Sequence, residues 1–173
     1  MKSKTAEKHK QESSDKINCA IITLSDSRSS KEDDKSGKYI FDLIENDYTV
    51  KSWEIIPDEK ENLTDEIEKL ISDDVDVILT NGGTGLSPRD ITVETVELLF
   101  EKKIDGFGEL FRAKSYEEIG SAALLSRATA GVYKKTIIFS MPGSPNAVKT
   151  AMDIIVDELP HFVHHVQKNR NEF

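Results

Sequence analysis

The sequence lacks the features that would support a disulfide framework, a membrane span or a nucleic-acid-binding surface. Cys19 is the only cysteine among 173 residues, which excludes an intrachain disulfide and a cysteine-rich metal site. No run reaches the ~18 consecutive apolar residues of a transmembrane helix, and the N-terminus lacks the apolar core of a signal peptide. Asp and Glu number 32 against 23 Lys and Arg, and the resulting net charge of −9 argues against phosphate-backbone binding. We therefore expect a cytoplasmic protein that binds neither membrane nor nucleic acid.

The length and composition of the chain favour a single domain. A chain of 173 residues can bury a sizeable core, but it is short for two ordinary domains without a break. Residues 1–16 are mostly Lys, Glu, Ser and Gln without apolar periodicity, so we expect a disordered N-terminal tail. We expect one domain over residues 17–167 and a C-terminal tail over 168–173. Cys19 lies inside an apolar run, which favours burial as a small hydrophobe.

Strand-like apolar runs alternate with helical patterns along this domain. Runs at 17–24, 75–79 and 137–139 are nearly continuous, as in strands that are covered on both faces, and a fourth strand is predicted over 50–56. Residues 129–133 and the Lys134-Lys135 turn predict a small hairpin. Amphipathic helical patterns lie at 40–44, 63–71, 93–100 and 147–155. The alternation predicts an α/β fold: a three-layer αβα domain with a mostly parallel sheet and a small β-hairpin excursion.

Three polar loops follow the three continuous runs, at residues 23–28, 80–90 and 140–146. In an open α/β sheet, ligands bind outside the carboxyl ends of the strands. In the third loop, Ser144 is a natural helix N-cap with Pro145 at the first helical position, so free N–H groups would face the crevice. A capped helix without any ligand is the alternative for that loop.

The loop at residues 80–90, TNGGTGLSPRD, is the strongest candidate and is called the glycine loop below. Glycines let backbone N–H groups approach an anion closely and adopt left-handed dihedral angles. Leu86 stands where a P-loop needs Lys, and Pro88 stands where the dinucleotide pattern needs its third glycine. The loop therefore predicts a phosphate cradle that belongs neither to a P-loop ATPase nor to a nicotinamide dehydrogenase.

Asp58 and Asp90 are the candidate carboxylates beside this cradle. Carboxylates repel polyphosphate unless a cation lies between them, and Mg²⁺ takes one or two carboxylates together with phosphate oxygens and water. Arg89 and Arg28 could add charge-assisted contacts to phosphate, although surface ion pairing is the default for either side chain. Both aspartates also have interpretations without a ligand, because Asp58 and Glu61 fit a capping box and Asp90 fits a turn or a cap.

The remaining polar candidates are weaker. His161, His164 and His165 cluster near the C-terminus without a carboxylate at motif spacing, so we expect them to be solvated or to pack in the core. Ser126 and Arg127 precede the predicted hairpin, where they either reach the crevice or form an ordinary turn.

The chain resembles the MoaB/Mog family of molybdenum cofactor biosynthesis proteins over about residues 17–165. The resemblance rests on these segments and the glycine loop: LSDSR at 24–28, DKSG at 34–37, IPDE at 56–59, GFGE at 106–109, FR at 111–112, SYEEIG at 115–120, LSRA at 125–128, AGV at 130–132 and MPGSP at 141–145. The segments at 115–120 and 141–145 resemble the MoaB branch more closely than Mog.

This resemblance implies a three-layer α/β domain that assembles as a trimer or a dimer of trimers and binds molybdopterin. Active members are nucleotidyltransferases, molybdopterin adenylyltransferases, which transfer AMP from Mg²⁺-ATP to the molybdopterin phosphate and release pyrophosphate. The resemblance assigns Asp58 and Asp90 to metal binding and catalysis. The candidate substrate-binding residues are Ser25, Asp26, Gly82, Gly83, Thr84, Gly85, Arg89, Pro142, Gly143 and Ser144. The alternative is a non-catalytic molybdopterin-binding protein or trimeric scaffold of the same pathway, for molybdenum or tungsten.

Overall fold

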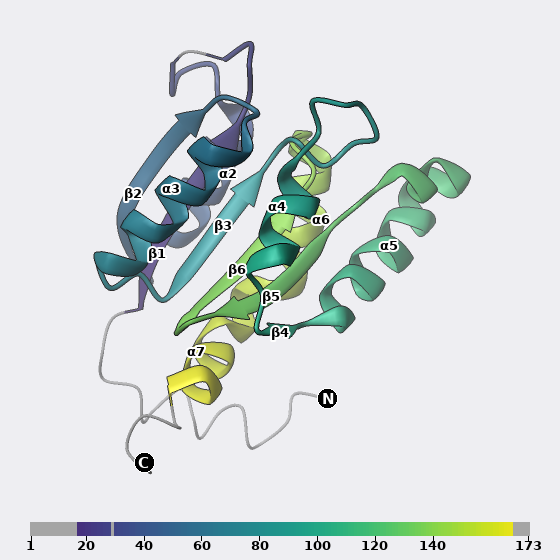
Figure 1. Ribbon diagram of the computed structural model, residues 1–173. Coiled ribbons are helices and arrows are strands. Elements are labelled where there is room, and N and C mark those ends of the chain that lie inside the picture. The colour runs from purple at the N-terminus through teal and green to yellow at the C-terminus, as the bar shows by residue number, and fades with distance from the viewer. Residues whose placement is uncertain (1–16, 29, 168–173) are drawn as a thin grey trace.

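The computed structural model describes residues 17–28 and 30–167, so the tails expected at 1–16 and 168–173 lie outside the described residues. Strands and helices alternate along the chain, and helices cover both faces of a central sheet (Figure 1). The elements are β1 (Asn18–Leu24), α2 (Lys35–Ile44), β2 (Thr49–Ile56), α3 (Lys60–Ser72), β3 (Val77–Asn81), α4 (Thr92–Leu99), β4 (Lys102–Lys103), α5 (Asp105–Ile119), η1 (Gly120–Leu125), β5 (Thr129–Tyr133), β6 (Thr136–Met141), α6 (Pro145–Ile155), η2 (Val156–Glu158) and α7 (Leu159–Gln167). The predicted α/β class is confirmed.

A six-stranded mixed sheet, in the order β2-β1-β3-β6-β5-β4, organises these elements. The first four strands are parallel, whereas β5 runs antiparallel to both β6 and β4. Strands β5 and β6 form the predicted hairpin, and Lys134 in its turn has a φ of 54°. Because β1, β3 and β6 are neighbours, their carboxyl ends lie side by side and bring the three polar loops to one edge.

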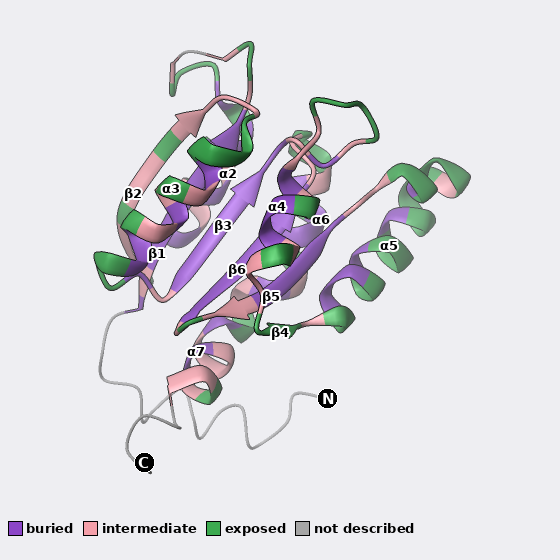
Figure 2. Ribbon diagram, in the orientation of Figure 1, coloured by how far each residue is buried: buried purple, intermediate pink, exposed green. Residues whose placement is uncertain are grey.

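The core lies on both faces of the sheet, because successive side chains of a strand point to opposite faces. In β1, Cys19 and Ile21 pack with α2, α5, α6 and α7, whereas Ala20 and Ile22 pack with α3 and α4. Figure 2 shows the resulting pattern: the central strands are buried, and the exposed residues of the helices lie on their outward faces. Burial raises the pKa of Cys19 to about 12, which fits the expected inert, packed thiol.

Helix α5 leaves the simple alternation and packs against α6 and β5. Phe107 and Phe111 on its inner face are buried, and the Phe107 ring centroid lies 5.2 Å from that of Phe139 in β6. This anchoring carries the C-terminal end of α5, followed by η1, to the loop edge of the sheet. Within the described ranges, none of the helices is long and apolar enough to span a membrane.

Candidate functional site

A cleft of about 910 Å³ opens at the carboxyl ends of β1, β3 and β6. Three sides of it come from the polar loops, and α5 with η1 supplies a further wall. The sequence-predicted site residues that line it are Ser25, Asp26, Asp58, Gly82, Gly83, Thr84, Gly85, Asp90, Pro142, Gly143 and Ser144. Arg89 is the predicted site residue that is not part of this lining.

The glycine loop has a backbone that only glycine adopts without strain at its first two glycines. Gly82 has a φ of 96° and Gly83 a φ of 61°, both in the left-handed region. A Cβ on Gly82 would collide with the carbonyl oxygen of Leu24. A Cβ on Gly83 would meet the Thr92 hydroxyl and lie 2.6 Å from Asp58 Oδ1. The tight turn therefore also brings Asp58 directly against the loop.

The carbonyl groups of residues 82–85 accept hydrogen bonds from side chains and backbone that do not line the cleft. Thr92 donates its hydroxyl and its amide to the first two carbonyls, at 2.8 and 2.9 Å. The Arg127 guanidinium donates to the last two, at 2.8 and 2.7 Å. The N–H groups of Gly83 and Thr84 donate to no acceptor within the described part of the chain. Such a loop presents donors to an anion.

The loop before α6 meets the glycine loop across the cleft. Ser144 Oγ accepts a hydrogen bond from the Ala147 N–H at 3.3 Å, so the predicted N-cap is confirmed. Gly82 donates its N–H to the Met141 carbonyl at 3.1 Å, which joins the two loops. The buried Ser36 hydroxyl donates to the Gly143 carbonyl at 2.8 Å. Helix α6 thus begins at the cleft wall, and its N-terminal dipole favours an anion there.

Asp58 does not cap α3, so the capping-box interpretation is wrong. The helix begins one residue later, with Glu59 at the N-cap and no side-chain capping bond. Asp58 instead donates its own N–H to Asp26 Oδ1 at 3.1 Å, and its buried Oδ1 has no hydrogen-bond partner among the described residues. Burial, followed by the charge of Asp26, raises the pKa of Asp58. A buried carboxylate oxygen without a donor requires a proton or a cation.

Asp90 is held differently. Its Oδ2 accepts the Ser87 N–H at 2.8 Å, so the predicted turn role is confirmed. Burial alone would raise the pKa of Asp90, but the hydrogen bonds from Ser87 and Gly85 and the charge of Arg127 outweigh it and lower the pKa. Asp90 therefore stays ionised at neutral pH, whereas at Asp58 burial outweighs the contributions that lower the pKa.

The two carboxylates fit a Mg²⁺ ion better than a metal bound entirely by protein groups. In the ranges that the structure describes, no group of three or more His, Cys, Asp or Glu residues converges as a metal site. Mg²⁺ keeps several waters and takes one or two carboxylates together with substrate phosphate oxygens. The unpaired oxygen of Asp58 and the ionised Asp90 meet that requirement.

The two arginines predicted near the cleft have different positions. Arg89 donates from Nε and Nη2 to the Asp26 carboxylate at 2.9 and 2.8 Å, which lowers the pKa of Asp26. Arg28 lines the cleft, and its Nη1 lies 3.5 Å from Asp34. Arg89 therefore ties the loop after β1 to the glycine loop, and Arg28 carries positive charge within the cleft.

A buried polar network below the loops was not recognised from the sequence. Asp34 is fully buried and accepts hydrogen bonds from the Thr23 hydroxyl at 2.5 Å, the Trp53 indole at 3.0 Å and the Gly37 N–H at 2.9 Å. Thr23 in turn accepts a hydrogen bond from Asn81 at 2.8 Å. The network joins α2 to the ends of β1, β2 and β3. An Asp directly before a helical pattern was the available signal, because it marks an N-cap.

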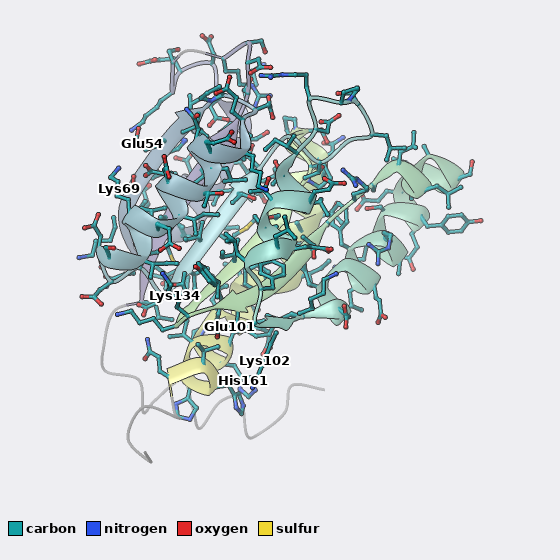
Figure 3. All side chains as sticks on the ribbon, in the orientation of Figure 1. Glu54, Lys69, Glu101, Lys102, Lys134 and His161 are labelled. Carbon is teal, nitrogen blue, oxygen red and sulfur yellow. The ribbon has the colours of Figure 1, made fainter. Side chains whose placement is uncertain are left out.

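Sequence reasoning missed most of the wall that α5 and η1 contribute, with Ser115, Glu118, Ile119 and Leu125 in the lining. Ser126, which was expected either to reach the crevice or to form a turn, lines the cleft, whereas Arg127 does not. No local signal in the sequence tells where a helix crosses a sheet edge. The C-terminal histidines lie elsewhere: His161 on α7 is at the opposite end of the sheet from the glycine loop (Figure 3), and none of the three lines the cleft.

Comparison with known proteins agrees with this architecture. Residues 20–161 match the family described as "Probable molybdopterin binding domain". Molybdenum cofactor biosynthesis protein B of Bacillus subtilis (strain 168) is 45% identical over 170 residues, which cover 96% of this chain and 99% of that protein. The Bacillus anthracis protein of the same name is 48% identical over 157 residues, covering 88% and 92%. A crystal structure of the tungsten cofactor synthesizing protein MoaB from Pyrococcus furiosus has a TM-score of 0.82 at 40% identity, over 87% of this chain and 97% of that one.

These matches span nearly all of the described domain, including the three polar loops, Asp58 and Asp90. The chain belongs to the molybdopterin-binding-domain family, within its molybdenum cofactor biosynthesis protein B (MoaB) branch.

Proposed function

We propose that the protein is a molybdopterin adenylyltransferase of molybdenum or tungsten cofactor biosynthesis. One juxtaposition supports the proposal above all: the glycine loop, with free N–H groups at Gly83 and Thr84, packs at Gly83 against the unpaired carboxylate oxygen of Asp58. Donors suit a phosphate, and an orphan carboxylate suits a cation, so the two together suit a metal-bound polyphosphate. The family description supplies the pterin, because residues 20–161 match a probable molybdopterin binding domain, and the relatives are named for molybdenum cofactor biosynthesis.

The charges of the cleft support a nucleotide bound with a metal over a bare anion. Asp26, Asp58, Asp90 and Glu118 line it, against Arg28 as a positive partner. A triphosphate alone would meet repulsion from these carboxylates, because like charges at close range destabilise each other. With Mg²⁺ held by Asp58 and Asp90, the same carboxylates contribute to binding.

In the proposed reaction, a terminal phosphate oxygen of molybdopterin attacks the α-phosphorus of ATP. A P–O bond forms there, the bond from the α-phosphorus to the bridging oxygen breaks, and pyrophosphate leaves with that electron pair. The glycine-loop N–H groups and the α6 N-terminus bind and orient phosphate oxygens. Bound Mg²⁺ would neutralise charge on the triphosphate and on the leaving pyrophosphate. No general base is required, because phosphoryl-type transfer depends mainly on positioning and charge neutralisation.

The test is a turnover assay on the purified protein with molybdopterin, ATP and Mg²⁺. We expect adenylylated molybdopterin and pyrophosphate in equal amounts, with the signal lost on chelation of Mg²⁺. Molybdopterin binding without product, under conditions where an active relative turns over, would instead identify a non-catalytic binding protein. Because the adenylylated pterin precedes metal insertion, the same assay applies to a molybdenum or a tungsten pathway.

A further inference from the structure

We propose that Arg127 is a positioning residue, which holds the glycine loop in its anion-binding conformation from behind without contacting the ligand. This inference deepens the proposed function, because it rests on the glycine loop as the phosphate cradle. Arg127 lies between η1 and β5, 42 residues beyond Gly85 in the chain, and does not line the cleft. Its effect on the ligand therefore passes through the loop backbone.

Arg127 joins three groups with one planar side chain. Nε donates to the Thr84 carbonyl at 2.8 Å, and Nη2 donates to the Gly85 carbonyl at 2.7 Å. Nη1 and Nη2 also bond the two carboxylate oxygens of Glu94 on α4. The Arg127 side chain is 27% exposed, and its bonds to the two loop carbonyls are partly buried, whereas those to Glu94 are exposed. A fork of five donors in fixed geometry can satisfy all of these acceptors, whereas an ammonium group cannot.

These bonds determine which way the loop peptides face. A peptide whose carbonyl points to Arg127 directs the N–H of the next residue the opposite way, so Arg127 orients the N–H groups of Gly85 and Leu86. Thr92, on the helix that carries Glu94, fixes the two preceding carbonyls, whose peptides carry the free N–H groups of Gly83 and Thr84. Without Arg127, the Thr84 and Gly85 carbonyls would lose their donors, and the second half of the loop would be held by the hydrogen bonds from Gly85 and Ser87 to Asp90.

The charge of Arg127 adds a second effect on the site. It helps to hold the pKa of Asp90 below its ordinary range, after the bonds from Ser87 and Gly85. The same guanidinium lowers the pKa of Glu94 through its hydrogen bond. Arg127 thus places positive charge near Asp90, the residue that closes the loop.

Arg127→Met tests the inference, because Met keeps much of the side-chain volume and removes the donors and the charge. Lys103→Met is the matched control. It also removes one positive charge, and it breaks the ion pair of 2.8 Å between Lys103 and Glu97, which lies on α4 like Glu94 but away from the cleft. Hydrogen exchange of the amides in residues 83–87 is measured without ligand, and inorganic pyrophosphate with Mg²⁺ is the binding probe. Arg127→Lys provides a conservative comparison.

We expect Arg127→Met to speed exchange in the loop and to weaken pyrophosphate binding at least ~10-fold, while Lys103→Met matches the wild type. Arg127→Lys should restore less than half of the lost binding free energy. Unchanged loop exchange would overturn the inference, and so would faster exchange with unchanged pyrophosphate affinity. If the wild type binds pyrophosphate through an Arg127-dependent loop but forms no adenylylated pterin, the inference stands and the proposed function fails. Absence of pyrophosphate binding in the wild type would overturn the inference.

Discussion

Replacing Asp34 by Asn should destabilise the fold by about 2–5 kcal/mol, because this fully buried carboxylate joins α2 to the strands below the cleft. Hydrogen bonds to an ionised acceptor contribute ~1.5–3 kcal/mol each, against ~1 kcal/mol for a neutral acceptor. Asn can keep its oxygen toward Thr23 and Trp53, and it then loses the charge assistance of two bonds. Its NH₂ group faces the Gly37 N–H, and loss of that cap costs ~1 kcal/mol.

Urea unfolding measures this effect directly. Trp53 is the only tryptophan and donates to Asp34, so its fluorescence follows the network itself. Far-UV circular dichroism serves as a second probe, because the substitution changes the indole's own partner. Asp42→Asn is the control, because it removes a carboxylate from α2 as well. The Asp42 carboxylate pairs with Lys38 at 2.8 Å on the surface, where ion pairs contribute little to stability.

The reasoning would be refuted if Asp34→Asn and Asp42→Asn had the same midpoint and slope in urea. A shift seen by fluorescence but not by circular dichroism would also count against it, since it would mean that only the environment of the indole had changed. Agreement of both probes on a loss of about 2–5 kcal/mol would show that the charged network stabilises the whole domain.

Three further predictions concern the cleft. Because the folded-state pKa of Asp58 is raised, its contribution to stability is fully present below the unfolded pKa and is lost as pH rises through the folded pKa. Without Mg²⁺, the melting temperature should therefore fall more steeply with rising pH in the wild type than in Asp58→Asn. Parallel pH profiles of the two proteins would contradict this. Asp90→Asn should lower Mg²⁺-dependent turnover at least ~100-fold and leave molybdopterin binding in place, and unchanged turnover would remove Asp90 from the mechanism. Gly83→Ala should lower the free energy of unfolding by at least ~1 kcal/mol in chemical denaturation and weaken pyrophosphate binding, because φ is 61° and a Cβ would meet Thr92. The control Gly106→Ala, where a Cβ meets nothing within 4 Å, should be neutral or stabilising. Equal effects at both positions would count against the backbone argument.

Local chemistry in the sequence predicted much of the fold. Apolar runs of strand length alternating with helical periodicity indicated the α/β class, and Ser144-Pro145 marked the start of α6 correctly. The hairpin at 129–141 was also recognisable, because two β-like runs flank a short turn. These features depend on residues that are near one another in the chain, so a pattern of period 2 or 3.6 records them.

The candidate site was predicted in part, because its loops are recognisable from residues that are close in the sequence. The order β2-β1-β3-β6 makes the three loop-bearing strands neighbours, and eleven of the twelve candidate metal- and substrate-binding residues line the cleft. The capping-box interpretation of Asp58 failed, because the spacing to Glu61 fits a cap whether or not the helix begins there. Arg89 was a candidate for phosphate with ion pairing as the alternative, and the structure pairs it with Asp26 on another loop.

The sequence by itself determined the strands, the helices and a loop whose glycines permit a left-handed turn. Only the tertiary structure decided which acceptors that loop leaves satisfied and which donors it leaves free. Arg127 reaches the loop from 42 residues away, and Asp34 joins four elements through hydrogen bonds that no local pattern records. Hydrogen bonding and burial depend on distance in space, whereas sequence periodicity reports only which side of its own element a residue occupies.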